Sequence, residues 1–318
     1  MPEWLDRIKS GSDTTESGSS MRGRLAREMI SHIASGRLLG RRIKSGELRK
    51  RMVEPEWKVP ECFVMEQIDM EHFSMRLLSS KENPNPKKVI LQLHGGGYMA
   101  GVRNAYYVFA GLYNELSHGY SVLTPDYRVA PEHPYPAALQ DALAAYRWLL
   151  ERGFFGEQII LAGDSAGGGL AMALTMYLRD AGMPMPCGVI AMSPWTDLTA
   201  SGESYQTNFT KDPLFGNTTE SMIYQNDYVG EHDPMDPYIS PLFGDFREFP
   251  DMLIQVGSIE MLLSDSLEVA AKAREQGARV RISVYEGMFH VFQMAYLAIP
   301  ESRRAWEEIG RFLDVVSK

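Results

Sequence analysis

Residues 158–168 read Gln-Ile-Ile-Leu-Ala-Gly-Asp-Ser-Ala-Gly-Gly, and this stretch decides the fold. An apolar run that favours a strand ends at Ala162, and a helix-forming run begins near Gly168. Between them, Gly163-Asp164-Ser165-Ala166-Gly167 has the form G-x-S-x-G. On a sharp strand-to-helix turn the flanking positions must be glycine, because a Cβ there would clash across the turn. The turn would expose the Ser165 hydroxyl at a helix N-terminus, so we expect a nucleophile there.

Similar apolar runs recur along the chain and alternate with helical patterns. The runs lie at about 63–69, 73–78, 88–93, 120–125, 158–162, 187–192, 252–256 and 280–285. From the third run onward, helical segments separate them, at 105–117, 137–151, 168–181, 264–276 and 301–316. Such alternation predicts an α/β fold with a mostly parallel eight-stranded sheet flanked by helices. The first two runs have no helix between them and should form an antiparallel hairpin at one edge.

Two segments do not fit this alternation. About sixty residues rich in Asp, Asn, Thr and Pro separate Met192 from Met252, which indicates an inserted element rather than a structureless loop. Near the N-terminus, Leu25, Met29 and Ile33, then Leu39 and Ile43, have helical spacing and predict two short amphipathic helices broken near Gly36 and Gly40. We expect the insertion and these helices to pair as a helical cap over the C-terminal edge of the sheet, where open α/β folds bind ligands. The predicted division is 1–55 and 199–240 for the cap, and 56–198 and 241–318 for the core.

A glycine run follows the third predicted strand. The residues are His94-Gly95-Gly96-Gly97, and three glycines in a row allow backbone N–H groups to approach a substrate oxygen closely. Together with the serine motif, the run predicts an oxyanion hole formed by the N–H groups of Gly96, Gly97 and Ala166. His94 precedes the serine in the chain, and we expect it to support the glycine loop. A phosphate-binding loop is excluded, since neither G-x-G-x-x-G nor Gly-Lys-Ser/Thr is present.

A general base and an orienting acid should follow the serine in this chain order. Only two histidines lie after Ser165: His232, inside the acidic insertion, and His290, in a short loop after the last predicted strand. The loop position favours His290 as the base. Glu260 is the first candidate for the acid, because it ends the penultimate strand. Two alternatives remain open: Asp197, at the end of the preceding strand, and Asp265, for which a helix N-cap role would suffice.

The overall composition limits the function classes. The chain has 318 residues, two cysteines and a net charge of −9, which is typical of a globular protein without a disulfide framework and argues against nucleic-acid binding. Charge is unevenly distributed: residues 21–51 hold ten basic and two acidic residues, a local +8 that leaves −17 elsewhere. No secretory leader pattern and no apolar stretch near the ~18 residues of a membrane span are present. We therefore expect a cytoplasmic protein without stable membrane insertion.

These motifs together resemble the hormone-sensitive-lipase family of α/β-hydrolases, the bacterial family IV esterases. The resemblance covers nearly the whole chain beyond residue 25. It rests on four segments, which are His94-Gly-Gly-Gly-Tyr98, Asp126-Tyr127-Arg128 with residues 131–138, residues 163–168, and the His290 loop. One departure is Glu260, where most relatives place aspartate.

The resemblance implies a serine carboxylesterase that acts on small, short-acyl esters through an acyl-serine, with no cofactor and no metal. It also implies an ester substrate as the partner, and a homodimer as one arrangement that the family uses. Two other functions stay open at this stage. Hydrolysis of amide or N-acyl bonds would use the same triad, whereas a small-molecule receptor would lack a working one. The basic segment 21–51 is interpreted as part of the cap, attracted across the pocket mouth to the acidic residues Asp212, Asp227, Glu231, Asp233 and Asp236.

Overall fold

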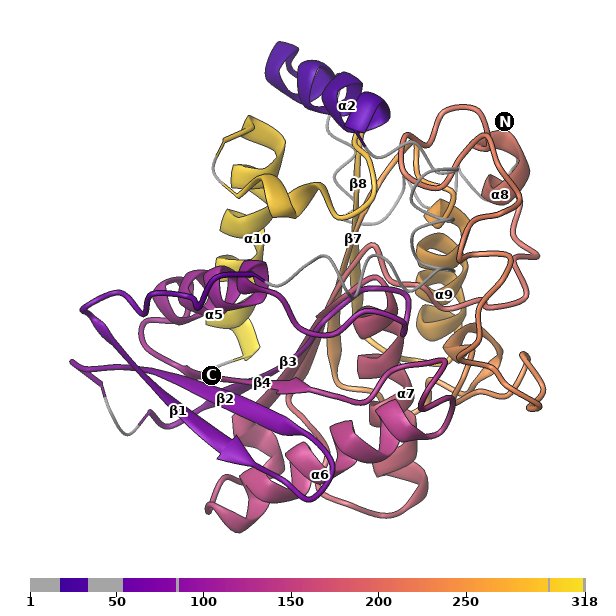
Figure 1. Ribbon diagram of the computed structural model, residues 1–318. Helices are drawn as coiled ribbons and strands as arrows, with labels where there is room; N and C mark the ends of the chain where they lie inside the picture. Colours follow the sequence, from indigo (N-terminus) through magenta and orange to yellow (C-terminus); the bar gives the residue numbers. More distant parts are fainter. Residues whose placement is uncertain (1–17, 34–53, 84–85, 297, 317–318) are drawn as a thin grey trace.

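The computed structural model describes residues 18–33, 54–83, 86–296 and 298–316 (Figure 1). One twisted sheet runs through the centre of this part of the chain, with helices on both of its faces. The second predicted N-terminal helix, with Leu39 and Ile43, and most of the basic segment lie outside the described residues.

The sheet has eight strands in the order β1-β2-β4-β3-β5-β6-β7-β8. Strands β1 and β2 pair antiparallel, as do β2 and β4, and all the other neighbours are parallel. This confirms the predicted edge hairpin and the mostly parallel sheet. The bounds are β1 Phe63–Asp69, β2 Ser74–Ser80, β3 Val89–Leu93, β4 Ser121–Asp126, β5 Ile159–Asp164, β6 Gly188–Met192, β7 Asp251–Gly257 and β8 Val280–Tyr285. The central strands β3, β5 and β6 are buried along their whole length, because helices cover both faces.

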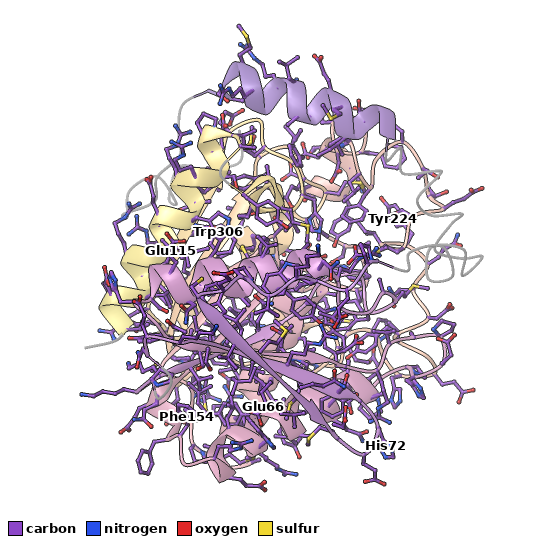
Figure 2. All side chains as sticks on the ribbon, turned by 60° about the vertical axis from the view of Figure 1, so that its left-hand side comes forward. Glu66, His72, Glu115, Phe154, Tyr224 and Trp306 are labelled. Carbon is purple, nitrogen blue, oxygen red and sulfur yellow. The ribbon has the colours of Figure 1, made fainter. Side chains whose placement is uncertain are left out.

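Two helices cover one face of the sheet and three cover the other. Helices α5 (Asn104–Leu116) and α10 (Pro300–Val316) pack together on the first face, where Trp306 of α10 lies edge-on to Phe109 at a centroid distance of 4.8 Å (Figure 2). Helices α6 (Ala137–Glu151), α7 (Ala166–Asp180) and α9 (Leu263–Glu275) cover the second face. Alternate residues of β5 supply the two cores, with Leu161 on one side and Ile160 on the other.

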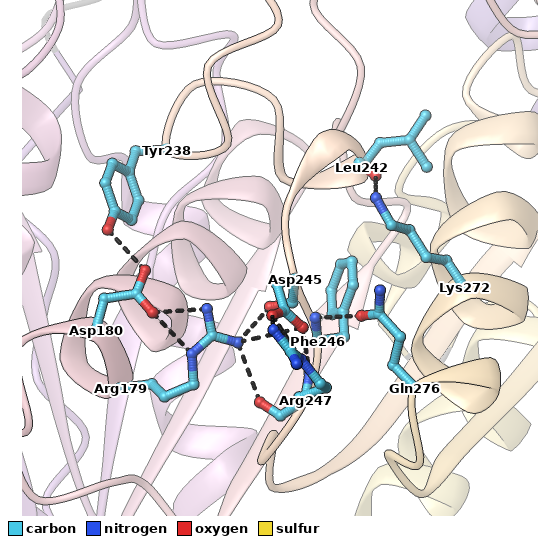
Figure 3. A network of polar contacts seen from close by, with 9 residues as sticks. All are labelled: Arg179, Asp180, Tyr238, Leu242, Asp245, Phe246, Arg247, Lys272 and Gln276. Atoms are coloured by element: carbon cyan, nitrogen blue, oxygen red, sulfur yellow. Dashed lines mark hydrogen bonds and ion pairs between the residues drawn. The ribbon is translucent and has the colours of Figure 1, made fainter.

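The insertion leaves the sheet after β6 and returns before β7. Residues 199–240 form mainly turns and contain one short α-helix, α8 (Ser204–Thr207). The returning chain is tied to the helices below it by a polar network (Figure 3). Arg179 of α7 donates to the carbonyl of Arg247 at 3.0 Å, and Lys272 of α9 donates to the carbonyl of Leu242 at 2.8 Å. The insertion is therefore anchored where it rejoins the core.

Helix α2 (Met21–Ile33) confirms the first predicted N-terminal helix, but the prediction of its buried face was wrong. Leu25 and Met29 are 56% and 62% exposed. The stripe that packs on the body instead contains Gly23, Ala26 and Ile30. Gly23 allows this close approach, because a Cβ there would lie 2.7 Å from Met288, in the loop after β8. The Ser20 hydroxyl fixes the start of the helix by donating to the buried Glu301 of α10 at 3.0 Å, and it accepts the N–H of Gly23.

Candidate active site

Ser165 lies on a strained turn between β5 and α7. Its φ is +53°, in the left-handed region that side chains rarely adopt. A Cβ at Gly163 would lie 2.2 Å from the carbonyl oxygen of Gly167, and a Cβ at Gly167 would lie 2.1 Å from the carbonyl oxygen of Leu93. Both flanking glycines are thus required by sterics, as the motif predicts. Helix α7 begins at Ala166, slightly before the predicted start near Gly168.

Asp164 fastens this turn to the glycine loop. Its buried carboxylate accepts the Gly95 N–H at 3.1 Å and the Tyr106 hydroxyl at 3.2 Å. The contact is close, since a Cβ on Gly95 would lie 2.3 Å from Oδ2 of Asp164. Burial raises the pKa of Asp164 to about 6, although these two donors and the charge of His290 act in the opposite direction. The serine turn and the glycine loop therefore form one unit.

The glycine loop presents backbone N–H groups beside Ser165. Gly96 and Gly97 have φ values of +115° and +63°, which glycine adopts without strain. Within the described residues, no protein group accepts a hydrogen bond from either N–H. The N–H of Ala166 is the first of α7 and has no acceptor within the helix. The three predicted donors are thus available to a ligand.

His94 supports the base of this loop. Its ring is completely buried and stacks on Tyr127 at a centroid distance of 3.9 Å. Its Nδ1 lies 2.8 Å from the carbonyl oxygen of Gly95. Burial lowers the pKa of His94, which favours the neutral ring. This placement agrees with the supporting role expected of His94.

His290 lies in the loop after β8 and is oriented by Glu260. Nδ1 of the imidazole is 2.9 Å from Oε2 of Glu260, and both side chains are buried. The other carboxylate oxygen of Glu260 accepts the Ser193 hydroxyl at 2.8 Å. Burial raises the pKa of Glu260, and the hydrogen bond from His290 opposes that rise. Because Nδ1 is engaged, Nε2 is the ring nitrogen left for Ser165. No hydrogen bond joins the Ser165 hydroxyl to His290 in the described part of the chain, but both side chains line one cavity.

The structure places the rival acids elsewhere. The expected N-cap role of Asp265 was wrong, because the N-cap residue of α9 is Leu262. Asp265 lies inside α9 and accepts the N–H groups of Thr196 and Asp197, each at 2.8 Å, because the loop after β6 passes directly over it. Asp197 in turn accepts the N–H groups of Thr199 and Ser201. Both carboxylates therefore stabilise turns. His232 is exposed in the insertion.

The cavity that Ser165 and His290 line has a volume of about 890 Å³. The insertion contributes Leu214, Phe215 and Met222 to its wall, and the ring of Phe215 lies 4.7 Å from that of His290. Phe209, also in the insertion, does not line it. The lining also includes five charged side chains from outside the insertion, namely Glu54, Glu56, Arg76, Arg103 and Asp126. Its size suits a small ligand.

Sequence reasoning did not predict a set of insertion residues that hold the site together. Asp212 was expected to be one of the surface charges facing the basic segment, which was wrong. It is buried and accepts the N–H groups of Leu214, Phe215 and Met261 at 2.8–3.0 Å. Asn208 donates to the carbonyl of Glu260 at 2.8 Å. The only sequence signal for Asp212 and Asn208 is an Asp or Asn in a turn-rich segment, and this signal does not indicate which distant residue the side chain contacts.

In the ranges given above, no group of three or more His, Cys, Asp or Glu side chains is arranged to hold a metal ion. No helix in the same part of the chain has both the length and the apolar character needed to cross a membrane. The arginines of α2 form no ion pair with the acidic residues of the insertion in this part of the chain. The other basic residues of segment 21–51 lie outside the described residues, so the proposed attraction between the two cap segments stays a prediction.

Comparisons with known proteins agree with this geometry. A family described as an α/β-hydrolase fold matches residues 90–294. The chain is 40% identical to an acetyl-hydrolase of Streptomyces hygroscopicus, over 71% of this chain and 75% of that protein. It is 36% identical to an esterase of Acinetobacter venetianus, over 73% of this chain and 76% of that protein. Among solved structures, an esterase from the bacterial hormone-sensitive lipase family superposes with a TM-score of 0.80, at 33% identity over 93% of this chain and 98% of that one.

Proposed function

The chain belongs to the hormone-sensitive-lipase family of α/β-hydrolases and is a carboxylic-ester hydrolase. We propose that it cleaves small, short-acyl esters through an acyl-enzyme intermediate on Ser165. The observation that carries the proposal is the buried Glu260–His290 pair, which lines one cavity with a serine on a strained turn. This is the arrangement of a nucleophile, a base and an orienting acid.

In the first half of the proposed reaction, Oγ of Ser165 attacks the ester carbonyl carbon. Nε2 of His290 takes the hydroxyl proton as the new C–O bond forms, and the carbonyl electron pair moves onto oxygen. The N–H groups of Gly96, Gly97 and Ala166 stabilise that oxyanion. When the intermediate collapses, the bond to the alcohol oxygen breaks, and the proton on His290 passes to the leaving alcohol. A hydrogen bond between base and nucleophile often becomes short only when substrate is bound, so its absence in the free protein is compatible with this role.

In the second half, water replaces the alcohol. His290 takes a proton from the water while the water oxygen attacks the acyl carbon. The N–H groups of Gly96, Gly97 and Ala166 stabilise the second oxyanion. Collapse breaks the bond to Oγ, returns the proton to Ser165 and releases the carboxylic acid. Glu260 keeps Nδ1 protonated throughout, so that Nε2 is free to accept a proton in each half.

The preference for short acyl groups is supported by the walls of the cavity. The lining combines Leu214, Phe215 and Met222 of the insertion with five charged side chains from outside it. Glu54 and Arg103 form an ion pair of 3.0 Å that is partly open to solvent, and a long alkyl chain laid against these charged residues would remove them from water, which is unfavourable. We propose that the segments 1–55 and 199–240 form the cap over this cavity, with the residues around Leu214 as the part that touches substrate.

A substitution at Ser165 tests the proposal. Ser165→Ala should reduce the hydrolysis of p-nitrophenyl acetate by at least several hundredfold, with the melting temperature little changed. The matched control is Ser80→Ala at the end of strand β2, in the edge hairpin, which should keep full activity. Mass spectrometry after mixing with a slowly released acyl donor should find the acyl group on the peptide containing Ser165. Retained turnover in the alanine variant would refute the assignment.

The acyl preference requires a separate panel. Esters of p-nitrophenol from acetyl to palmitoyl should show kcat/KM falling steeply beyond about eight carbons, if the charged wall excludes long chains. Matching p-nitroanilides distinguish ester from amide hydrolysis. A maximum at long chains, or faster cleavage of the anilides, would contradict the proposed substrate class while leaving the serine mechanism intact.

A further inference from the structure

The insertion contacts the glycine loop from above at one residue. Nδ2 of Asn226 donates to the carbonyl oxygen of Gly97 at 2.8 Å. The orientation of this amide is itself fixed, because Oδ1 of Asn226 accepts the N–H of Tyr228 at 2.7 Å. The two hydrogen bonds use opposite ends of the side chain, so only one orientation of the amide satisfies both. Asn226 therefore presents a donor at a defined place over Gly97.

Two neighbours of Asn226 hold the same short stretch of the loop. Met222 packs against Gly97 so closely that a Cβ on the glycine would lie 2.3 Å from its sulfur. The ring of Tyr228 stacks on the ring of Tyr98, the next residue of the loop, at a centroid distance of 3.8 Å and an angle of 6°. Both rings are buried. The loop is thus restrained at Gly97 and at Tyr98 by one seven-residue segment of the insertion.

The restraint matters because Gly97 has no side chain to limit its rotation. Its φ of +63° is one of several values that glycine can adopt at little cost. The peptide that carries the Gly97 N–H is held within the loop, where the N–H groups of Met99 and Ala100 donate to the Gly96 carbonyl at 3.1 Å each, and Asn226 holds the next peptide. A hydrogen bond on the Gly97 carbonyl fixes the peptide that follows the Cα, and the Met222 sulfur limits movement of the Cα itself. Together with the hydrogen bonds to the Gly96 carbonyl, they leave the Gly97 N–H little freedom, and a donor held in place before the reaction needs no reorganisation during it.

We propose that Asn226 is a positioning residue for the oxyanion hole, and that the segment Met222–Tyr228 fixes the Gly97 N–H for catalysis. The proposal rests on the proposed function, in which that N–H binds the oxyanion. Asn226 does not touch the reacting atoms. It acts through the Gly97 carbonyl, and so its loss should weaken the binding of the transition state more than the binding of substrate.

The substitution Asn226→Asp tests this. The variant keeps the size of the side chain and the acceptor for Tyr228, but it replaces the donor with a carboxylate oxygen that repels the Gly97 carbonyl. We expect kcat for p-nitrophenyl acetate to fall about tenfold to a hundredfold, less than the ~10²–10³-fold cost of removing an oxyanion donor outright, with KM changed by less than about threefold. Asn226→Ala removes both hydrogen bonds without adding a charge, and it should also lower kcat.

A second readout separates positioning from general damage. In the matching thionoester, sulfur replaces the carbonyl oxygen and accepts hydrogen bonds weakly, so the oxyanion hole contributes less to its hydrolysis. The ratio of oxoester to thionoester kcat should therefore fall in both Asn226 variants by a factor similar to the loss in kcat. Gln225→Ala is the matched control, because its side chain is exposed in the same segment and donates to the carbonyl of Thr219 at 3.4 Å. This variant should leave the ratio unchanged.

The outcomes distinguish this proposal from the proposed function. If Ser165→Ala is inactive while the Asn226 variants match the wild type, the positioning role is overturned and the serine mechanism stands. Equal losses on the two esters would indicate a merely structural role and would also overturn it. If Ser165→Ala retains activity, the proposed function itself fails.

Discussion

Glu260 and His290 form a hydrogen bond of 2.9 Å between two side chains that are almost completely removed from solvent. The carboxylate is held from behind by the Ser193 hydroxyl, and its backbone is held by Asn208. The side chain of Glu260 is longer than that of aspartate, and it reaches Nδ1 of His290 from a backbone position that Asn208 helps to fix.

This pair gives the first prediction. Glu260→Gln should lower kcat about 10³–10⁴-fold with little change in KM, because a neutral amide neither selects the reactive tautomer of His290 nor stabilises the imidazolium. Glu260→Asp should retain more activity but still lose about tenfold or more, since the shorter side chain cannot reach Nδ1 from the same backbone position. Steady-state kinetics on p-nitrophenyl acetate measures both. If Glu260→Asp were as active as the wild type, the loop that carries residue 260 would have to move, and it would not be fixed by its contacts.

Asp212 gives a prediction on stability. Asp212→Ala would leave three backbone N–H groups without their acceptor, at about 1–3 kcal/mol for each group that stays buried, so the free energy of unfolding should fall by several kcal/mol. Activity should also fall, since one of these groups is the N–H of Met261, next to Glu260. Urea unfolding measures the first effect. Asp233→Ala, which removes an exposed carboxylate bonded to the Met235 N–H, should change stability by less than about 1 kcal/mol.

The pKa of Asp164 predicts a pH effect with a definite sign. The carboxyl titrates near pH 6 in the folded protein but near 3.8 when unfolded, so the folded state binds more protons between these values. Its contribution to stability is therefore lost as pH rises from about 4 to about 6, by up to about 3 kcal/mol. Asp164→Asn does not titrate, and the difference in unfolding free energy between wild type and variant should shift by this amount over that window. A difference that does not vary with pH would contradict the raised pKa.

A pair of glycines tests the steric reasoning. Gly95→Ala should strongly destabilise the protein or abolish activity, because its Cβ would lie 2.3 Å from the Asp164 carboxylate. Gly111→Ala, on α5, would place a Cβ at an ordinary 3.5 Å from the Phe63 ring and should raise the stability by about 0.5–1 kcal/mol through better helix propensity. Thermal unfolding compares the two. Equal effects would show that the distances do not govern the outcome.

Most of the fold could be predicted from the sequence because its strands and helices repeat at the periods that burial requires. The eight strands lie within two residues of their predicted bounds, since each is an apolar run between turn residues. Helix α2 shows where periodicity fails. Leu25 and Met29 have the spacing of a buried stripe, yet the helix packs through Gly23 and Ala26, because small residues permit a closer approach than large ones. The sequence pattern does not reveal which of the two faces of α2 packs against the rest of the protein.

The candidate site divides in the same way. Ser165, the glycine loop and His290 belong to local motifs whose chemistry requires those residue types. Three carboxylates remained as candidates for the acid, and only the fold shows that Glu260 alone contacts His290, while Asp197 and Asp265 hold turns. Asn226 could not be predicted, because its partner lies 129 residues away and is a backbone atom. Side chains that act on backbone leave no paired pattern in a single sequence.

The contacts of the insertion with both halves of the candidate site bear on how such an enzyme could change its substrate. Engineers often treat a variable segment above a pocket as an exchangeable part, to be replaced while the catalytic core is kept. Here the same segment supplies wall residues and also braces the loops of Gly97 and Glu260. A transplanted segment would need to bring both braces with it, so new specificity should be easier to obtain by single changes at Leu214 or Phe215 than by exchanging the whole insertion.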